Sequence, residues 1–451
     1  MLPNEELFFK YDLPVPRYTS YPPYPYWKKI FTQEEFLNTY NANFLTKNEI
    51  EISLYIHLPF CESLCYFCGC NKVITKNHEL EIPYINKLLI EIDNYLNIFK
   101  RPIKLKELHL GGGTPTFFSP SNLKLLFSEI FKRIEISNNR DFSVEVHPKV
   151  TNKEHFDVLK EYSFERLSIG VQDFNPDVQK IIGREQTYND IEFCTQYARK
   201  IGFKSVNFDL IYGLPEQNPE SILATLSTVY KLKPDRIAFY SYAHVPQLKP
   251  SQSKLSKTSL PSGKEKHLIY KTAFDSLTNN SYFSLGFDHF ALNTDSLYQS
   301  ALQGKLHRNF MGFTTQNSSI LLGIGVSAIS DFGLFYVQNK KSFSEYMELT
   351  RNESFNFESG YIMNETDLVI KQHILNLACY HKTSFQHFPL DVNLKEKIIE
   401  NLIPYKIDKL IELDNETIQV TPLGLVFLRN ICSTFDQFTE LKKNTSYSQS
   451  I

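Results

Sequence analysis

Between about Ile50 and Pro246 the chain alternates short runs of β-branched and aromatic residues with longer amphipathic stretches of helical period. No other feature of the sequence restricts the fold as much. The short runs lie at 52–58, 106–110, 142–146, 166–172, 205–213 and 235–243. They predict parallel strands joined by right-handed helical crossovers, which form a full or partial (β/α) barrel or, alternatively, an open doubly wound sheet. A barrel of this kind carries its chemistry at the carboxyl ends of its strands.

Start signals precede three of the intervening helical stretches. They are Ser119-Pro120, Thr151 and Asn218-Pro219. Each lies where a crossover between two predicted strands is needed. The sequence therefore predicts one helix after each of these positions.

A chain of 451 residues is long enough for two or three domains. Residues 1–47 are rich in Pro and Tyr, and the run at 16–27 predicts an irregular, extended N-terminal arm. Residues 48–350 are expected to form the barrel and its extension. Residues 351–451 are expected to form a mainly helical C-terminal domain, with a small hairpin and a helix within 410–431.

The charge of the chain is nearly balanced, with 48 Lys and Arg against 50 Asp and Glu and a formal net charge of −2. No overall basic field indicates binding to nucleic acid or to an anionic membrane surface. The first residues lack the basic and apolar regions of a signal peptide, so we expect a cytoplasmic protein. No apolar run reaches the roughly 18 residues that span a bilayer.

Four of the seven cysteines lie within ten residues: Cys61, Cys65, Cys68 and Cys70. In a reducing compartment such a cluster marks a metal or redox site more often than a disulfide. The other three are scattered and are predicted to be buried apolar thiols: Cys194, Cys379 and Cys432.

Three thiolates on one loop can each bind one iron of a [4Fe-4S] cluster and leave the fourth iron open for chemistry. Such clusters reach potentials of roughly −700 mV, low enough to pass an electron to a bound acceptor. A structural zinc site or a fully ligated cluster would require four ligands. Cys68 and Cys70 lie too close in sequence to act comfortably as independent zinc ligands.

The C-x3-C-aromatic-x-C pattern after the YIHLPF strand resembles the radical S-adenosylmethionine (SAM) superfamily. The longer run CYFCGCNKVIT resembles one family within it, the oxygen-independent coproporphyrinogen III oxidases. The similarity continues through the following segments: PRYTSYP (16–22), LGGGTPTF (110–117), SVEVHP (143–148), RLSIGVQDFN (166–175), REQ (184–186), NFDLIYGLP (207–215), YAHVP (242–246), LHRNFMGFTTQ (306–316), LLGIGVSAIS (321–330) and RNIC (429–432). The similarity therefore covers nearly the whole chain. It implies that the fold is a radical SAM (β/α)6-type partial TIM barrel.

This resemblance implies that Cys61, Cys65 and Cys68 hold a [4Fe-4S] cluster whose open iron binds SAM. Reductive cleavage of SAM would give a 5′-deoxyadenosyl radical. The radical would start the oxidative decarboxylation of two propionates, converting coproporphyrinogen III to protoporphyrinogen IX. We name no acid–base residue, and we expect a monomer that receives electrons from a flavodoxin or ferredoxin.

The resemblance also implies two SAM molecules per chain. Contacts to the SAM on the cluster are expected from Tyr55, Gly112, Glu145 and Ile329. Contacts to a second SAM are expected from Phe67, Gly113, Thr114, Gln172, Arg184, Asp209 and Ala243. The candidate partners of the substrate propionates are Arg17, His307 and Arg308.

Two details of the pattern leave alternatives open. Cys70 is not a cluster ligand in the family, so its role could be in packing, redox chemistry or substrate contact. His147 stands where family members often have an acid. The competing functions are a haem-modifying radical SAM relative and a haem chaperone on the same barrel, but chaperone relatives generally lack both the CGC cysteine and the PRYTSYP arm.

Overall fold

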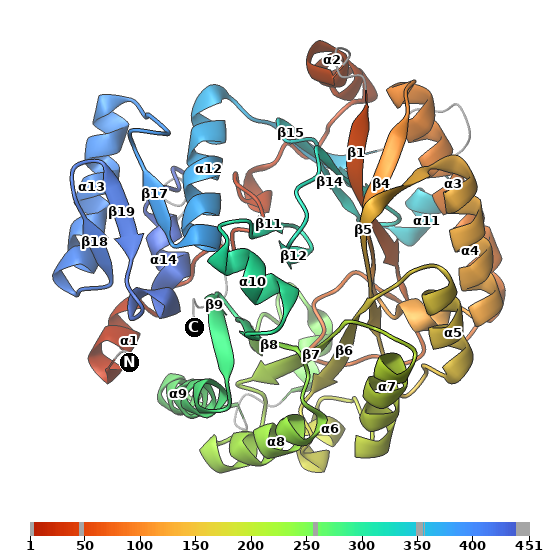
Figure 1. Ribbon diagram of the computed structural model, residues 1–451, viewed down its shortest axis with the longest axis horizontal. Coiled ribbons are helices and arrows are strands. Elements are labelled where there is room, and N and C mark those ends of the chain that lie inside the picture. Colours follow the sequence, from red (N-terminus) through yellow and green to blue (C-terminus); the bar gives the residue numbers. More distant parts are fainter. Residues whose placement is uncertain (1–3, 45–48, 256–259, 349–354, 356, 439–451) are drawn as a thin grey trace.

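A computed structural model describes residues 4–44, 49–255, 260–348, 355 and 357–438 (Figure 1). All six predicted strands are present: β1 (Ile50–Leu58), β4 (Ile103–Gly112), β5 (Glu135–Val146), β6 (Arg166–Gln172), β7 (Ser205–Tyr212) and β8 (Arg236–Ser241). Each pairs in parallel with the next. Most residues of β1 and β8 are buried on both faces, as expected for strands covered by helices.

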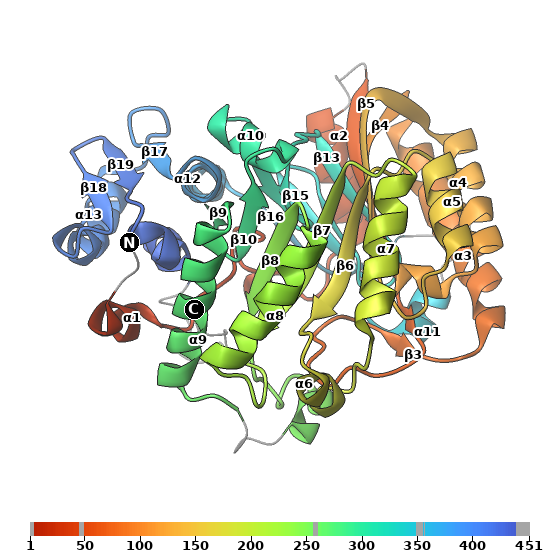
Figure 2. The same ribbon diagram turned by 60° about the horizontal axis from the view of Figure 1, so that its bottom comes forward.

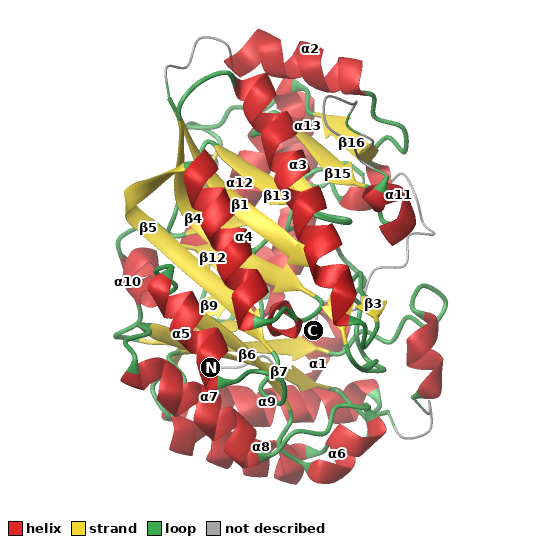
Figure 3. Ribbon diagram, turned by 90° about the vertical axis from the view of Figure 1, so that its right-hand side faces the viewer, coloured by secondary structure: helices red, strands yellow, loops and turns green. Residues whose placement is uncertain are grey.

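The crossover helices cover the outer face of the sheet (Figures 2 and 3). They are α3 (Glu81–Phe99), α4 (Pro120–Arg133), α5 (Lys153–Glu161), α6 (Pro176–Ile181), α7 (Tyr188–Lys200) and α8 (Pro219–Leu232). Ser119 and Asn218 cap α4 and α8 as predicted. The predicted start at Thr151 is wrong by one residue, because Asn152 caps α5. The Thr151 hydroxyl instead lies 2.8 Å from both the Thr116 hydroxyl and the His147 carbonyl, within hydrogen-bond distance of each.

Further strands extend the parallel sheet to twelve strands without closing it. On one side β13 (Ile320–Ile324) pairs in parallel with β1, and β14 (Ile329–Asp331), β15 (Phe335–Asn339) and β16 (Phe357–Ile362) follow in antiparallel order. On the other side β10 (His289–Leu292) and β9 (Tyr282–Gly286) follow β8. Because β16 and β9 are opposite edges, the barrel is partial, as the sequence predicts.

Smaller elements surround the sheet. They are β2 (Phe60–Cys61), β3 (Val73–Ile74), α9 (Gly263–Asn279), α10 (Ser296–Leu302), the hairpin of β11 (His307–Asn309) and β12 (Gly312–Thr314), and α11 (Phe343–Met347). Three short 3-10 helices lie at His78–Leu80, Pro115–Phe117 and Pro250–Lys254.

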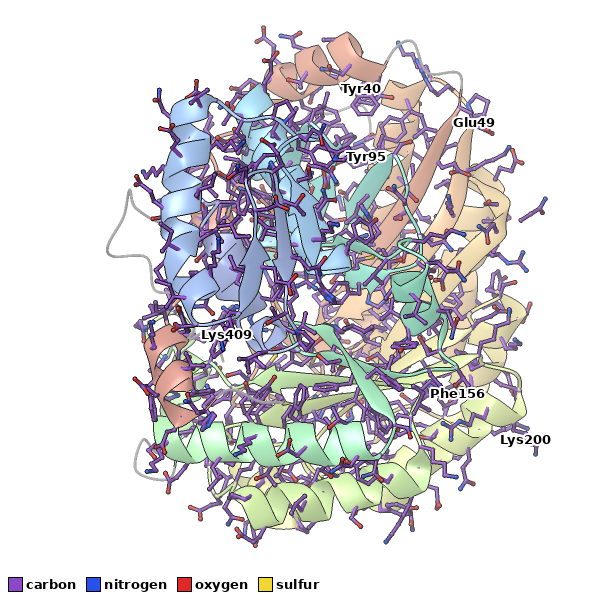
Figure 4. The ribbon with its side chains drawn as sticks, turned by 60° about the vertical axis from the view of Figure 1, so that its left-hand side comes forward. Tyr40, Glu49, Tyr95, Phe156, Lys200 and Lys409 are labelled. Carbon is purple, nitrogen blue, oxygen red and sulfur yellow. The ribbon has the colours of Figure 1, made fainter. Side chains whose placement is uncertain are left out.

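The N-terminal segment is partly irregular. Of the run 16–27 that was predicted to be irregular, residues 16–23 contain no helix or strand, whereas Tyr24–Tyr26 form a short 3-10 helix. The helices α1 (Glu5–Tyr11) and α2 (Gln33–Phe44) flank this run and were not predicted. The arm lies against the C-terminal part of the chain, where Arg429 donates to the Val15 and Pro16 carbonyls. In Figure 4, Tyr40 of α2 and Tyr95 of α3 lie inside the molecule, and both are fully buried.

The predicted hairpin and helix within 410–431 are present as β18 (Ile411–Leu413), β19 (Thr417–Val420) and α14 (Leu428–Ser433). The remaining elements here are α12 (Glu365–Tyr380), β17 (Lys382–Ser384), α13 (Val392–Ile407) and a 3-10 turn at Gly424–Phe427. The scattered cysteines are buried, as predicted: Cys194, Cys379 and Cys432. Within the described residues no helix is both long and apolar enough to cross a membrane.

Candidate active site

A cavity of about 560 Å³ lies at the carboxyl ends of the barrel strands. Most of the residues that the sequence singled out line it: Cys61, Cys65, Cys68, Phe67, Gly112, Gly113, Thr114, Glu145, Gln172, Arg184 and Asp209. The other expected SAM contacts, Tyr55, Ala243 and Ile329, do not line it, and neither do the expected propionate partners, Arg17, His307 and Arg308. The lining residues come from the ends of β4, β5, β6 and β7, from the cysteine loop and, in the case of Arg184, from the segment between α6 and α7, so the parallel sheet brings them together.

Short strands hold the cysteine loop at both ends, because β2 pairs in parallel with β3. Inside the loop the Cys68 N–H donates to the Cys65 carbonyl at 3.2 Å, which forms a turn. Two cysteines also contact the barrel. The Cys61 thiol lies 3.3 Å from the Thr114 hydroxyl, and Arg184 Nη1 lies 3.7 Å from Cys65 Sγ.

The three cysteines fit a [4Fe-4S] cluster. Among the described residues no three Cys, His, Asp or Glu side chains converge on one point as a single metal ion would require. A [4Fe-4S] cluster needs no such convergence, because each thiolate binds a different iron. The hydrogen bond from Cys70, aided by the positive charges of Lys72 and Arg184, lowers the pKa of Cys68 to about 6, which favours the thiolate that iron requires.

Cys70 behaves differently from its neighbours. Its thiol is exposed and lines the cavity. Its hydrogen bond to Cys68 raises its own pKa well above the usual value, so it remains a neutral donor to the Cys68 thiolate. Cys70 therefore supports a neighbouring sulfur in this arrangement.

Gly112 occupies a position that only glycine can fill at the end of β4. Its φ is +112°, and a Cβ there would lie 2.6 Å from the His57 ring. The His57 ring is fixed by the Asn71 carbonyl at 2.9 Å and the Tyr55 hydroxyl at 3.0 Å. The backbone of β4 can thus approach a ligand closely.

Glu145 lies near the end of β5 and faces the cavity as an ionised carboxylate. Burial acts to raise its pKa, but the hydrogen bond with His109 and the Gly112 N–H outweigh burial and lower the pKa overall. The Ser143 hydroxyl orients His109 at 2.7 Å. Glu145 can therefore accept hydrogen bonds from a ligand ammonium or hydroxyl at neutral pH.

Asp209 of β7 is the second cavity carboxyl. Burial, and then the negative charge of Glu145, raise its pKa to about 7, although Ser168 and Asn207 each donate a hydrogen bond at 2.9 Å. Asp209 can therefore either donate or accept near neutral pH. A cationic ligand would favour the ionised form.

Arg184 and Gln172 lie beside each other at the end of β6. Arg184 Nη2 donates to the Gly170 carbonyl at 2.8 Å, while its buried Nε has no hydrogen-bond partner in the described part of the chain. Gln172 has a φ of +66°, an uncommon conformation for a residue with a side chain. A strained backbone and an unsatisfied guanidinium nitrogen are typical of a ligand site.

The three expected SAM contacts outside the lining have other surroundings. Tyr55 lies behind the site, where its ring would contact a Cβ on Gly111 at 3.1 Å. Ile329 begins β14 and packs in a cluster with Trp27 and Tyr336. Ala243 follows β8 and is half-buried.

The cavity also contains residues that the sequence analysis did not assign to it. They are chiefly Lys72, Lys76, Lys149, His147 and Tyr240. Tyr240 lies near the end of a predicted strand, so its position could have identified it. The lysines are indistinguishable in sequence from ordinary solvated lysines.

Residues 55–229 match the model of the Radical SAM superfamily. The partial barrel and the three-cysteine loop at its mouth agree with this match, and together they define a radical SAM enzyme. Membership of this class implies a [4Fe-4S] cluster and SAM.

Comparison with individual proteins narrows the class. The chain is 37% identical to the oxygen-independent coproporphyrinogen III oxidase of Escherichia coli over 97% of this chain and 95% of that protein. It is 35% identical to the Synechocystis protein of the same name, over 99% and 98%. The solved structure of the Escherichia coli enzyme, described as a radical SAM enzyme, superposes with a TM-score of 0.90 at 36% identity, over 97% of this chain and 99% of that one. The chain therefore belongs to the oxygen-independent coproporphyrinogen III oxidase family.

Proposed function

We propose that this enzyme decarboxylates two propionates of coproporphyrinogen III to vinyl groups, giving protoporphyrinogen IX. The single observation that carries the proposal is the cysteine-lined cavity in a chain similar over nearly its full length to enzymes of that name. When bound, the cluster and SAM supply one-electron chemistry that removes a hydrogen atom from a propionate. Loss of carbon dioxide and of one further electron, which passes to an external electron acceptor, would then leave the vinyl group.

The protein's own residues would bind and orient rather than transfer protons. Glu145, held ionised by His109 and the Gly112 N–H, would accept from the SAM amine or ribose. Thr114 and Arg184 would fix the Cys61 and Cys65 sulfurs through their contacts to them. The barrel and its covering segments would keep water from the reactive carbon.

We further propose that two SAM molecules bind per chain. The support is that polar residues line the cavity at the ends of all four strands from β4 to β7 as well as on the cysteine loop. Thr114 and Arg184, the residues expected at the second SAM, contact Cys61 and Cys65, so a second SAM bound there would lie beside the proposed cluster. Equilibrium binding to the reconstituted enzyme should count two SAM per chain.

The electron donor would be an acidic protein such as a flavodoxin or ferredoxin. Lys72, Lys76 and Lys149 at the cavity supply the positive field that such a partner requires. We propose a cytoplasmic monomer of three parts, 1–47, 48–350 and 351–451. The arm would serve as a cover for the substrate.

An anaerobic assay with SAM, a low-potential reductant and coproporphyrinogen III tests the function. Product mass should fall in two steps, each by one carbon dioxide and two hydrogens. Cys68→Ala should abolish the reaction. Cys194→Ala is its matched control and should leave the reaction intact. If the intact enzyme cleaves SAM and binds haem but never decarboxylates the porphyrinogen, the haem-chaperone function is correct instead.

A further inference from the structure

Arg308 is a buried arginine outside the cysteine-lined cavity. It lies on β11, is 7% exposed, and has its guanidinium over the rings of Phe287 at 4.2 Å and Phe313 at 4.8 Å. Among the described residues its Nε and Nη1 have no hydrogen-bond partner. A buried guanidinium with two unsatisfied nitrogens is costly unless a ligand completes it.

Within the part of the chain that the structure describes, this guanidinium donates a single hydrogen bond, from Nη2 to the Arg17 carbonyl of the arm at 3.5 Å. That distance is at the long limit for a hydrogen bond. A carboxylate that displaced this carbonyl would pair with Nη2 and with either Nε or Nη1. One weak contact would thus be exchanged for a bidentate, charge-assisted pair.

The surroundings carry an excess of positive charge. Asp288 acts electrostatically on Arg308, Lys266 and Arg429, and its carboxylate lies 3.9 Å from Arg17, so this one carboxylate faces four cations. Burial lowers the pKa of Lys266 to about 8 and that of Arg429 to about 10. Asp12 adds a second negative charge near Lys266. An added anion would therefore be attracted.

A series of rings joins Arg308 to the cavity. Tyr240 lines the cavity, and its ring centroid is 6.0 Å from that of His289. His289 in turn lies 5.3 Å from Phe313, which contacts Arg308. The buried Nδ1 of His289 also has no hydrogen-bond partner in the part of the chain described. Three successive contacts, Tyr240–His289, His289–Phe313 and Phe313–Arg308, therefore connect the cavity wall with Arg308.

We propose that Arg308 binds the carboxylate of a propionate that the reaction retains, and so positions the macrocycle with a reacting propionate at the cavity. This inference rests on the proposed function. A propionate that is lost as carbon dioxide must reach the cavity, whereas Arg308 lies outside its lining. Only a retained carboxylate can remain on Arg308 through both steps.

The test measures binding of two porphyrins to the anaerobically reconstituted full-length enzyme, by porphyrin fluorescence. Coproporphyrin III carries four carboxylates, and protoporphyrin IX keeps only the two that the reaction retains. Arg308→Gln should weaken both by on the order of 100-fold, because it removes one partner of a buried ion pair. Arg308→Lys, which keeps the charge without the fork, should weaken both by about tenfold.

Arg133→Gln is the matched control, since this arginine lies on the outer helix α4 with Asp93 and Glu129 as its partners. It should leave both affinities unchanged. The dimethyl ester of protoporphyrin IX, which has no carboxylate, should bind wild type and Arg308→Gln equally. Iron content and SAM cleavage without substrate verify that each variant is folded.

Three results would overturn the inference: unchanged affinity of both Arg308 variants, weakening for coproporphyrin III alone, or equal weakening for the ester. The second would mean that Arg308 holds a propionate that reacts, and the third that only packing was lost. Failure of the proposed function is distinguishable from these results, because wild type itself would then not decarboxylate coproporphyrinogen III.

Discussion

Near the beginnings of the barrel strands charged side chains neutralise one another, whereas near the carboxyl ends they face a cavity. At the first location Arg166 pairs with Asp141 and lies 3.6 Å from Glu107, and Arg236 pairs with Asp295 at 2.8 Å. All five are largely buried. The barrel thus contains one charged layer that is complete and another that needs a ligand, as expected when one face serves stability and the other function.

The charged side chains at the carboxyl ends of the strands are not fully paired with one another. Asp209 has a pKa raised to about 7, and Arg184 Nε has no hydrogen-bond partner within the described residues. At the other end Arg166 holds the pKa of Asp141 below its usual value despite burial, which acts to raise it. The comparison predicts that substitutions at the beginnings of the strands reduce stability and that substitutions at the carboxyl ends reduce ligand binding and activity.

The largest effect is expected from Cys68→Ala, which removes one of the three proposed cluster ligands. Iron and sulfide content, the cluster absorbance and SAM cleavage should all be lost, while the fold survives in circular dichroism. Cys70→Ala should retain the cluster, because Cys70 only donates to Cys68. A full cluster in the first variant and none in the second would show that the ligand assignment is wrong.

Arg166→Met should cost about 3–5 kcal/mol of unfolding free energy, because it leaves Glu107 and Asp141 buried without their cation. Urea unfolding of the apoprotein measures this loss. Lys124→Met, which breaks an ion pair with Glu161 that is about half exposed, should cost less than about 1 kcal/mol. Equal losses in the two variants would contradict the idea of a complete buried layer.

Glu145→Gln should weaken SAM binding about 10- to 100-fold, since it removes a charged acceptor while keeping the shape of the side chain. The unfolding free energy should change by less than about 1 kcal/mol. Equilibrium binding and urea unfolding of the same preparation separate the two effects. A large loss of stability with normal SAM binding would place Glu145 in the structural layer instead.

Asp209→Asn should change the pH dependence of stability. The folded pKa is raised from 3.8 to about 7, so folding retains a proton that the unfolded chain releases. The stabilising contribution is complete below about pH 4 and is lost as the pH rises through 7, by at most about 1.4 kcal/mol per pH unit. Unfolding of wild type minus Asp209→Asn between pH 4 and 8 should show this slope, and a flat difference would contradict the raised pKa.

The smallest effect is expected far from either charged layer. Asn218→Ala removes the capping box of α8, in which the Asn218 side chain accepts from the Ser221 N–H at 2.8 Å. It should cost about 1 kcal/mol of stability and leave SAM cleavage unchanged. A change in activity would indicate that the crossover helices influence the cavity.

The sequence alone determined the six barrel strands, the caps at Ser119 and Asn218, the cysteine cluster that lines the cavity and the family. These features are local, because the hydrophobic period, the helix caps and the cysteine spacing each depend on residues that are close together in the sequence. The sequence did not reveal α1 or α2, because their buried faces pack on aromatic residues far away in the sequence. The ring centroids of Phe36 and Phe335 are 5.7 Å apart, and those of Tyr11 and Tyr405 are 4.6 Å apart.

Tertiary structure alone decided which side chains meet. It brought Arg184 to Cys65 across more than a hundred residues, placed Tyr55 behind the cavity rather than in its lining, and moved Ile329 into a cluster with Trp27. It also buried Arg308, two of whose nitrogens have no hydrogen-bond partner among the residues that the structure describes. The physical reason is that burial and electrostatic pairing depend on atoms from separate strands, and the packing of the sheet, not the local sequence, fixes their positions.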